Sequence, residues 1–167
     1  IYNSFLKNVS FNLYDGKCED SLNFINVKGN VSSIVINDAF QDALDIDFSN
    51  LSIDKVNINN SGNDCIDLSA GSYNLNFVEL IKCQDKAISI GEKSHLNLKN
   101  VFIDKSNIGI AVKDLSIYNG IKQNIDNTPI CLQVFKKKQE FGGAYANLDS
   151  INCKGRYEVD KDSILEN

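Results

Sequence analysis

The stretch Asp42-Ala43-Leu44-Asp45-Ile46-Asp47-Phe48 decides the fold, because apolar and acidic residues alternate strictly along most of it. Such alternation is typical of a β-strand with one buried face. The pattern returns 22 residues later as Asp64-Cys65-Ile66-Asp67-Leu68-Ser69, and related patterns occur at each further step. The steps fall at Asp20, Asp42, Asp64, Lys86, Ile108 and Ile130. A repeat of this length indicates a solenoid protein.

Each repeat contains two blocks of apolar residues at every second position, separated by polar turns rich in Asn, Ser, Gly and Asp. In the repeat that begins at Asp64, we assign Leu75, Phe77 and Leu80 to the buried face of the second block. Short strands without a helical pattern between them predict an all-β fold, a single-stranded right-handed parallel β-helix of about six rungs. A leucine-rich repeat has a similar period and is the alternative, but the second block is strand-like throughout.

The repeats divide the chain, residues 1–167, into parts of one β-helix domain. Residues 1–19 form a partial first rung, 20–134 the regular repeats, 135–143 a charged loop, and 144–167 the last rung and cap. In the first rung the inward candidates are Phe5, Val9, Phe11 and Leu13. A chain that begins within a rung predicts further rungs in a longer protein, or a partner that covers this end.

Composition limits the function classes. The net charge is −5, which argues against nucleic acid as a partner. No apolar run approaches the roughly 18 residues of a transmembrane helix, so we expect no membrane insertion.

The five cysteines lack metal-ligand spacing. Cys65 and Cys131 occupy a repeat position that small residues fill in the other rungs, and Cys83 occupies a second position of this kind. Cysteine behaves there as a small apolar residue, which favours buried free thiols. A Cys65–Cys83 or Cys131–Cys153 disulfide stays open, because each pair can be neighbours within or between rungs.

Acidic residues gather at equivalent positions of the first repeats. One predicted outward column contains Asn23, Asp45, Asp67, Ser89, Ala111 and Gln133, and a second contains Asp20, Asp42, Asp64 and Lys86. The ligand-binding candidates are Asp42, Asp45, Asp47, Asp64, Asp67 and Lys86. Stacked rungs would bring Asp45 and Asp67 to within about 5 Å. Clustered carboxylates are hard ligands, so Ca²⁺ at Asp45 and Asp67 is one interpretation. The other is that these are hydrated turn and ladder residues.

Several segments carry a resemblance: Asp42–Phe48, Lys-Ala-Ile-Ser-Ile-Gly-Glu-Lys at 86–93, Asn107–Asp114, and Lys-Lys-Lys-Gln-Glu-Phe-Gly-Gly at 136–143. They resemble the right-handed β-helix region of bacterial surface proteins, which often lies beside a spore-coat-kinase-like (CotH) module. The resemblance implies the pectate-lyase-like superfold. That superfold hosts lyases, epimerases, glycosidases, tailspikes and adhesive scaffolds, so it fixes no activity.

The sequence thus predicts a non-catalytic structural or glycan-binding module of an extracellular or cell-surface protein. Its expected partners are an acidic polysaccharide, or other chains of the same or a larger surface assembly. One alternative is a lyase or epimerase on an acidic polysaccharide, with Lys86 or Lys113 as the nearest base. Another is homotypic assembly through the solenoid ends. No catalytic set is assigned: Asn63–Asp67 echoes the acidic element of polygalacturonases, but the partner motifs are missing around His95 and Arg156.

Overall fold

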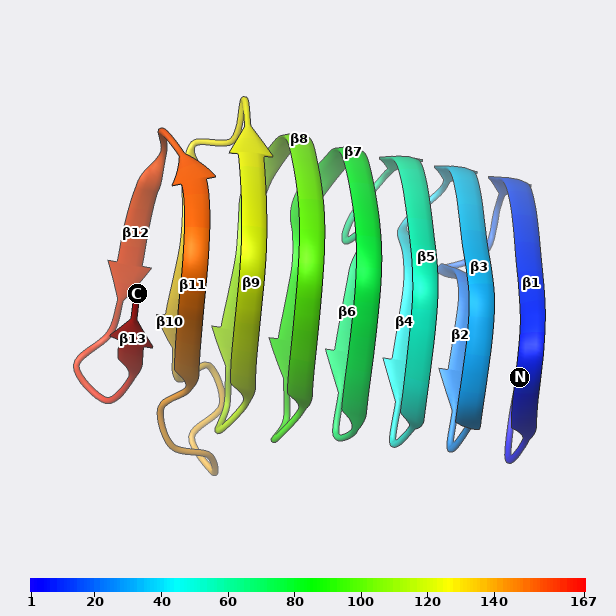
Figure 1. Cartoon of the computed structure of the whole chain (residues 1–167), viewed down its shortest axis with the longest axis horizontal. Coiled ribbons are helices and arrows are strands. Elements are labelled where there is room, and N and C mark those ends of the chain that lie inside the picture. The colour runs from blue at the N-terminus through cyan, green and yellow to red at the C-terminus, as the bar shows by residue number, and fades with distance from the viewer.

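The computed structural model describes all 167 residues as a parallel β-solenoid of about seven turns (Figure 1). It contains thirteen strands and no helix, and every pairing between strands is parallel. The prediction of an all-β solenoid with a 22-residue period is therefore confirmed. Strands also take the place of the convex segment that a leucine-rich repeat would need.

The strands stack into a long sheet and a short sheet, which lie in front and behind in Figure 1. The long sheet contains β1 (Phe5–Gly16), β3 (Lys28–Ala39), β5 (Asn50–Ser61), β7 (Ser72–Gly91), β8 (His95–Lys113), β9 (Ile117–Asp126), β11 (Tyr145–Cys153) and β13 (Ile164–Glu166). The short sheet contains β2 (Asp20–Ile25), β4 (Asp42–Asp47), β6 (Ile66–Ser69), the last residues of β7 and β8, β10 (Ile130–Phe135) and β12 (Arg156–Val159).

One continuous core of 38 buried apolar residues runs between the sheets. Equivalent residues of successive repeats stack in it: Leu44, Ile66, Ile88, Ile110 and Leu132 pair in register and have no exposed surface. Burial of such a column, at about 25 cal/mol per Å² of apolar surface, provides the main driving force for stacking the rungs.

The long strands bend in mid-course, and this bend corrects one assignment. Two consecutive residues face outward there, so the alternation of buried and exposed positions shifts by one residue. Phe77, predicted to be buried, is 60% exposed, and Val78 takes the core position. Phe5 is likewise exposed, and Leu6 packs against the core in its place.

The corners of the solenoid use left-handed backbone conformations at equivalent positions. One corner column with positive φ contains Asn26, Phe48, Ala70, Glu92 and Asp114, and the other contains Asp38, Asn60, Lys82, Lys105 and Asn127. Asparagine tolerates this conformation better than most residues. It also forms ladders between rungs, as where the Asn60 amide donates to Asp38 at 2.6 Å.

The expectation of free thiols is wrong for four of the five cysteines. Disulfides join Cys65 to Cys83 and Cys131 to Cys153, with Cα atoms 5.5 and 6.1 Å apart. Only Cys18 is free, and it is exposed. The two columns of small residues face each other across a corner. A cysteine in one column can therefore form a disulfide with a cysteine in the other.

The charged segment between β10 and β11 folds back onto two corners. The backbone N–H groups of Lys137 and Lys138 donate to Asp114 Oδ1 at 2.7 and 2.8 Å. The Lys138 side chain also pairs with Glu92. The structure has no helix that could cross a membrane.

Candidate functional site

The acidic face is the part of the short sheet formed by β2, β4, β6 and the end of β7. Its outward column is in the predicted register: Asp45 pairs with Asp67, and Asp67 with Ser89. The Asn23 amide donates to Asp45 Oδ2 at 2.6 Å. Asp47 lies opposite Ser69 at the end of β4. The repeat therefore places carboxylates of adjacent rungs side by side.

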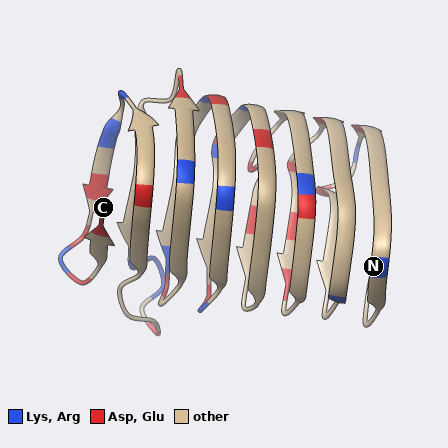
Figure 2. Cartoon of the chain, in the orientation of Figure 1, with Lys and Arg blue, Asp and Glu red and all other residues tan.

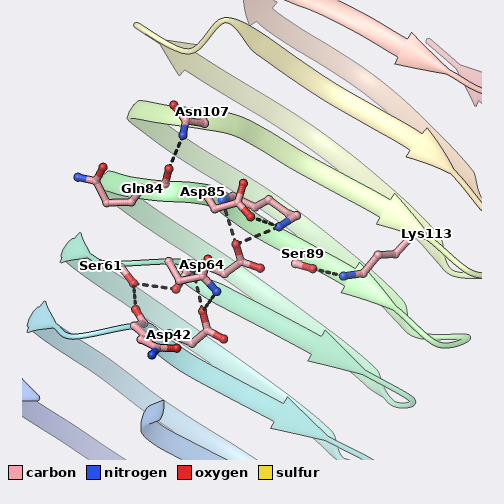
Figure 3. A network of polar contacts seen from close by, with 11 residues as sticks. Asp42, Ser61, Asp64, Gln84, Asp85, Ser89, Asn107 and Lys113 are labelled. Carbon is pink, nitrogen blue, oxygen red and sulfur yellow. Dashed lines mark hydrogen bonds and ion pairs between the residues drawn. The ribbon is translucent and has the colours of Figure 1, made fainter. Parts of the chain in front are cut away.

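The second column is held together by hydrogen bonds that climb from rung to rung (Figure 3). Asp42 Oδ1 accepts from the Asn63 amide at 2.7 Å and from the backbone N–H of Asp64 at 2.8 Å. Asp64 Oδ1 accepts from the backbone N–H of Lys86 at 2.9 Å, and from its ammonium at 3.3 Å. Each aspartate thus caps the turn of the following rung.

Two of the ligand-binding candidates, Asp64 and Lys86, are less accessible to a ligand than the sequence indicates. Asp64 is only 3% exposed, because the turn that it caps closes over it. The Lys86 ammonium contacts both Asp64 and Asp85. Burial acts to lower the pKa of Lys86, but the hydrogen bonds to Asp85 and Asp64 and the charges of these carboxylates together outweigh it and raise the pKa.

Partial burial raises the pKa of several carboxyl groups. Burial, with the charges of Asp47, Asp20 and Asp67, raises the pKa of Asp45 to about 7. Burial raises that of Asp64 to about 6 in spite of Lys86. Burial also raises the pKa of Asp20, Asp42 and Asp47. A fraction of the acidic face is therefore protonated near neutral pH.

The predicted outward column is buried at Ser89 and Ala111 and half-buried at Gln133, which is a second correction. Ser89 and Ala111 have no exposed surface. The Lys113 side chain lies across Gly91, where a Cβ atom would come within 2.8 Å of it, and its ammonium donates to Ser89 Oγ at 2.7 Å (Figure 3). Burial lowers the pKa of Lys113. This pair resembles an activated serine, but a fully buried hydroxyl offers no access to a substrate.

The acidic face does not form a preorganised metal centre. No group of three or more His, Cys, Asp or Glu side chains in the structure is arranged to hold a metal ion. Asp45 and Asp67 supply two carboxylates, whereas Ca²⁺ takes six to eight oxygen ligands. One oxygen of Asp67 is buried without a hydrogen-bond partner. The calcium interpretation stays a prediction.

A second surface, which the sequence reasoning missed, lies on the outer side of the long sheet at its bend. It is a shallow depression of about 330 Å³ across β5, β7, β8 and β9, which we call the Phe77–Phe102 depression. Phe77 is 60% exposed and Phe102 37%. The depression is lined by Lys55, Asn57, Phe77, Val78, Glu79, Asn100, Val101, Phe102, Lys122 and Asn124.

Strand register explains how the two aromatic rings come to share this surface. Phe77 on β7 lies opposite Asn100 on β8, and Glu79 lies opposite Phe102, so the two rings are diagonal neighbours. Lys55, Glu79 and Lys122 make no ion pair within the chain. Their charged groups are therefore free to meet a ligand.

A signal for this surface was present in the sequence. Pairs of non-core residues recur at the bend, as in Asp54-Lys55, Asn76-Phe77 and Lys99-Asn100. Reading Asn76-Phe77 as one of these pairs would have placed Phe77 outside. Once outside, it would have fallen in the column of Lys55 and Lys122.

The stacked parallel strands define the chain as a parallel β-solenoid protein. No family model, curated protein or solved structure matches the chain.

Proposed function

We propose that the chain is a non-catalytic scaffold module that binds carbohydrate on the outer side of its long sheet. The observation that carries this proposal is the Phe77–Phe102 depression. Aromatic rings provide apolar faces on which sugar rings can stack, and the flanking amide and charged groups can bond hydroxyls. Both kinds of group lie on strands of a rigid stack, so the surface is formed before a ligand arrives.

The two disulfides support a secreted or surface-displayed location. Disulfides persist in oxidising compartments and are rare in reducing ones. Cys65–Cys83 and Cys131–Cys153 each tie one corner of the solenoid. This location is the one in which a polysaccharide ligand is available, and it agrees with the surface-protein resemblance.

The alternative of a lyase or epimerase is less well supported by the geometry. Such an enzyme needs a base that is neutral and open to the substrate. Lys86 is held protonated by two carboxylates, and Lys113 is buried. None of the surface depressions includes either lysine or any of the candidate aspartates. A scaffold therefore accounts better for the acidic face.

The test is a binding assay of the whole chain against neutral and acidic polysaccharides, by affinity electrophoresis and calorimetry. We expect Phe77→Ala with Phe102→Ala to abolish retardation. Phe40→Ala is the matched control, because Phe40 is 65% exposed but lies outside the depression. Failure of the wild-type chain to bind any glycan would overturn the proposal, as would unchanged binding by the double variant.

Homotypic assembly is a second candidate, favoured by exposed aromatic side chains on and beside β1. Tyr2, Phe5 and Tyr14 are each more than 60% exposed. Exposed apolar side chains that gather on one face can mark an interaction site. Light scattering over a dilution series tests this: assembly predicts a mass that rises with concentration and falls in Phe5→Lys with Tyr14→Lys.

A further inference from the structure

We propose that the ligand of the Phe77–Phe102 depression is a linear anionic polysaccharide that lies along the solenoid axis, with its charged groups at Lys55 and Lys122. This inference rests on the proposed function and adds the ligand's charge, direction and minimum length. It places the ligand on the opposite side of the molecule from the acidic face.

The direction follows from the strand register. Lys55, Phe77, Asn100 and Lys122 lie opposite one another on four consecutive strands, so they form a row across the strands. Adjacent strands are about 4.8 Å apart, which puts the two lysine positions roughly 14 Å apart. The repeat of an extended pyranose chain is close to one strand spacing. A chain along the row can therefore present one sugar to each rung.

The charge follows from where free cations lie. The chain is acidic overall, but both ends of this row are lysines without a carboxylate partner. Asp54 precedes Lys55 but accepts a hydrogen bond from the Asn76 amide at 2.7 Å instead of pairing with it. Figure 2 shows one basic segment near mid-length on each of β5, β8 and β9, with an acidic segment beside the one on β5.

The neighbouring row supplies groups for sugar hydroxyls. Asn57, Glu79, Phe102 and Asn124 lie opposite one another on the same four strands. Amides donate and accept, and the Glu79 carboxylate accepts from hydroxyl groups. The arrangement suits a chain whose anionic groups lie at the two lysines and whose hydroxyl groups face the neighbouring row.

The chemistry that the lysines recognise is a monovalent anion on a sugar, which is a uronate carboxylate or a sulfate ester. The experiment measures affinity of the whole chain, by calorimetry at low salt, for four probes. They are oligogalacturonides of two and of five residues, dextran sulfate, and unmodified dextran. We expect the double variant Lys55→Gln with Lys122→Gln to bind the pentamer and dextran sulfate with about tenfold lower affinity. Lys28→Gln with Lys161→Gln, both exposed but outside the depression, should leave the affinities unchanged.

The outcomes distinguish the inferred anionic ligand from the proposed carbohydrate-binding function on which it rests. Tighter binding of either anionic probe than of dextran, lost in the lysine variant, supports the inference. The anionic probe that binds more tightly shows whether the anion is a carboxylate or a sulfate ester. Equal binding of the dimer and the pentamer would overturn the span of four rungs. Equal binding of dextran, sensitive to Phe77→Ala but not to the lysine variant, would overturn the anionic ligand and leave carbohydrate binding intact. Absence of all binding would overturn both.

Discussion

The two halves of the short sheet occupy the same repeat positions with opposite chemistry. In the first half, Asp45 and Asp67 stand side by side and burial raises the pKa of Asp45. In the second half the same column holds Ser89 and Ala111, which are fully buried and carry no charge. The backbone ladder is the same in both. The fold therefore depends on the inward residues, and the outward column can carry charge at a cost in stability.

The largest expected effect comes from the disulfides, one of which lies at each half. Replacing Cys65 and Cys83 by Ala should lower the free energy of unfolding by about 3 kcal/mol, because the bond closes a loop of intermediate length in the unfolded chain. The same change at Cys131 and Cys153 should cost a similar amount. Urea unfolding measures both, with Cys18→Ser as the control, since this thiol is free and exposed. A loss confined to one half would show that the halves differ in more than their outward column.

The acidic half should make stability fall as pH rises. The pKa of Asp45 is about 7 in the folded chain, and that of Asp64 about 6, against about 3.9 unfolded. Between pH 4 and 7 the folded state therefore binds more protons, so its free energy of unfolding decreases with rising pH. At pH 8, Asp45→Asn should stabilise by about 1 kcal/mol after solvent screening is allowed for, and at pH 4 by almost nothing.

Thermal unfolding at the two pH values measures this effect. A melting temperature that is independent of pH between 4 and 8 in the wild-type chain would contradict the account of the acidic half.

The corner columns run past both halves and give a smaller effect. Asn60 and Asn127 adopt a left-handed backbone conformation that asparagine tolerates, whereas Lys82 lies in the same conformation between them. Lys82→Asn should stabilise by about 0.5 to 1 kcal/mol by relieving this strain. Asn60→Lys should instead lower the free energy of unfolding, because it introduces this strain and also removes the hydrogen bond to Asp38. Chemical denaturation checks both, and equal signs would contradict the strain argument.

The sequence predicts what periodicity determines and misses what the corners and the bend determine. Because stacking places equivalent residues in one column, a period of 22 was enough to pair Asp45 with Asp67. Alternation within a strand could not show the double outward step at the bend, so Phe77 was assigned to the core. A small residue at a corner can be a packed thiol or half of a disulfide, and the place of Cys65 in a column of small residues favoured the thiol. The burial of Ser89 depends on the conformation of Lys113, which no local pattern encodes.

The smallest expected effect is that of calcium on the acidic half. Asp45 and Asp67 offer two carboxylates, and no third acidic side chain completes a site with them. Ca²⁺ would have to take most of its ligands from water, which leaves little gain over the hydrated ion. We therefore expect millimolar Ca²⁺ and EDTA to give the same melting temperature at pH 8, to within about 1 °C. A Ca²⁺-dependent rise that Asp45→Asn with Asp67→Asn removes would show instead that the carboxylates recruit further oxygens. The acidic half would then be a binding surface, and its raised pKa values would be a property of the metal-free chain.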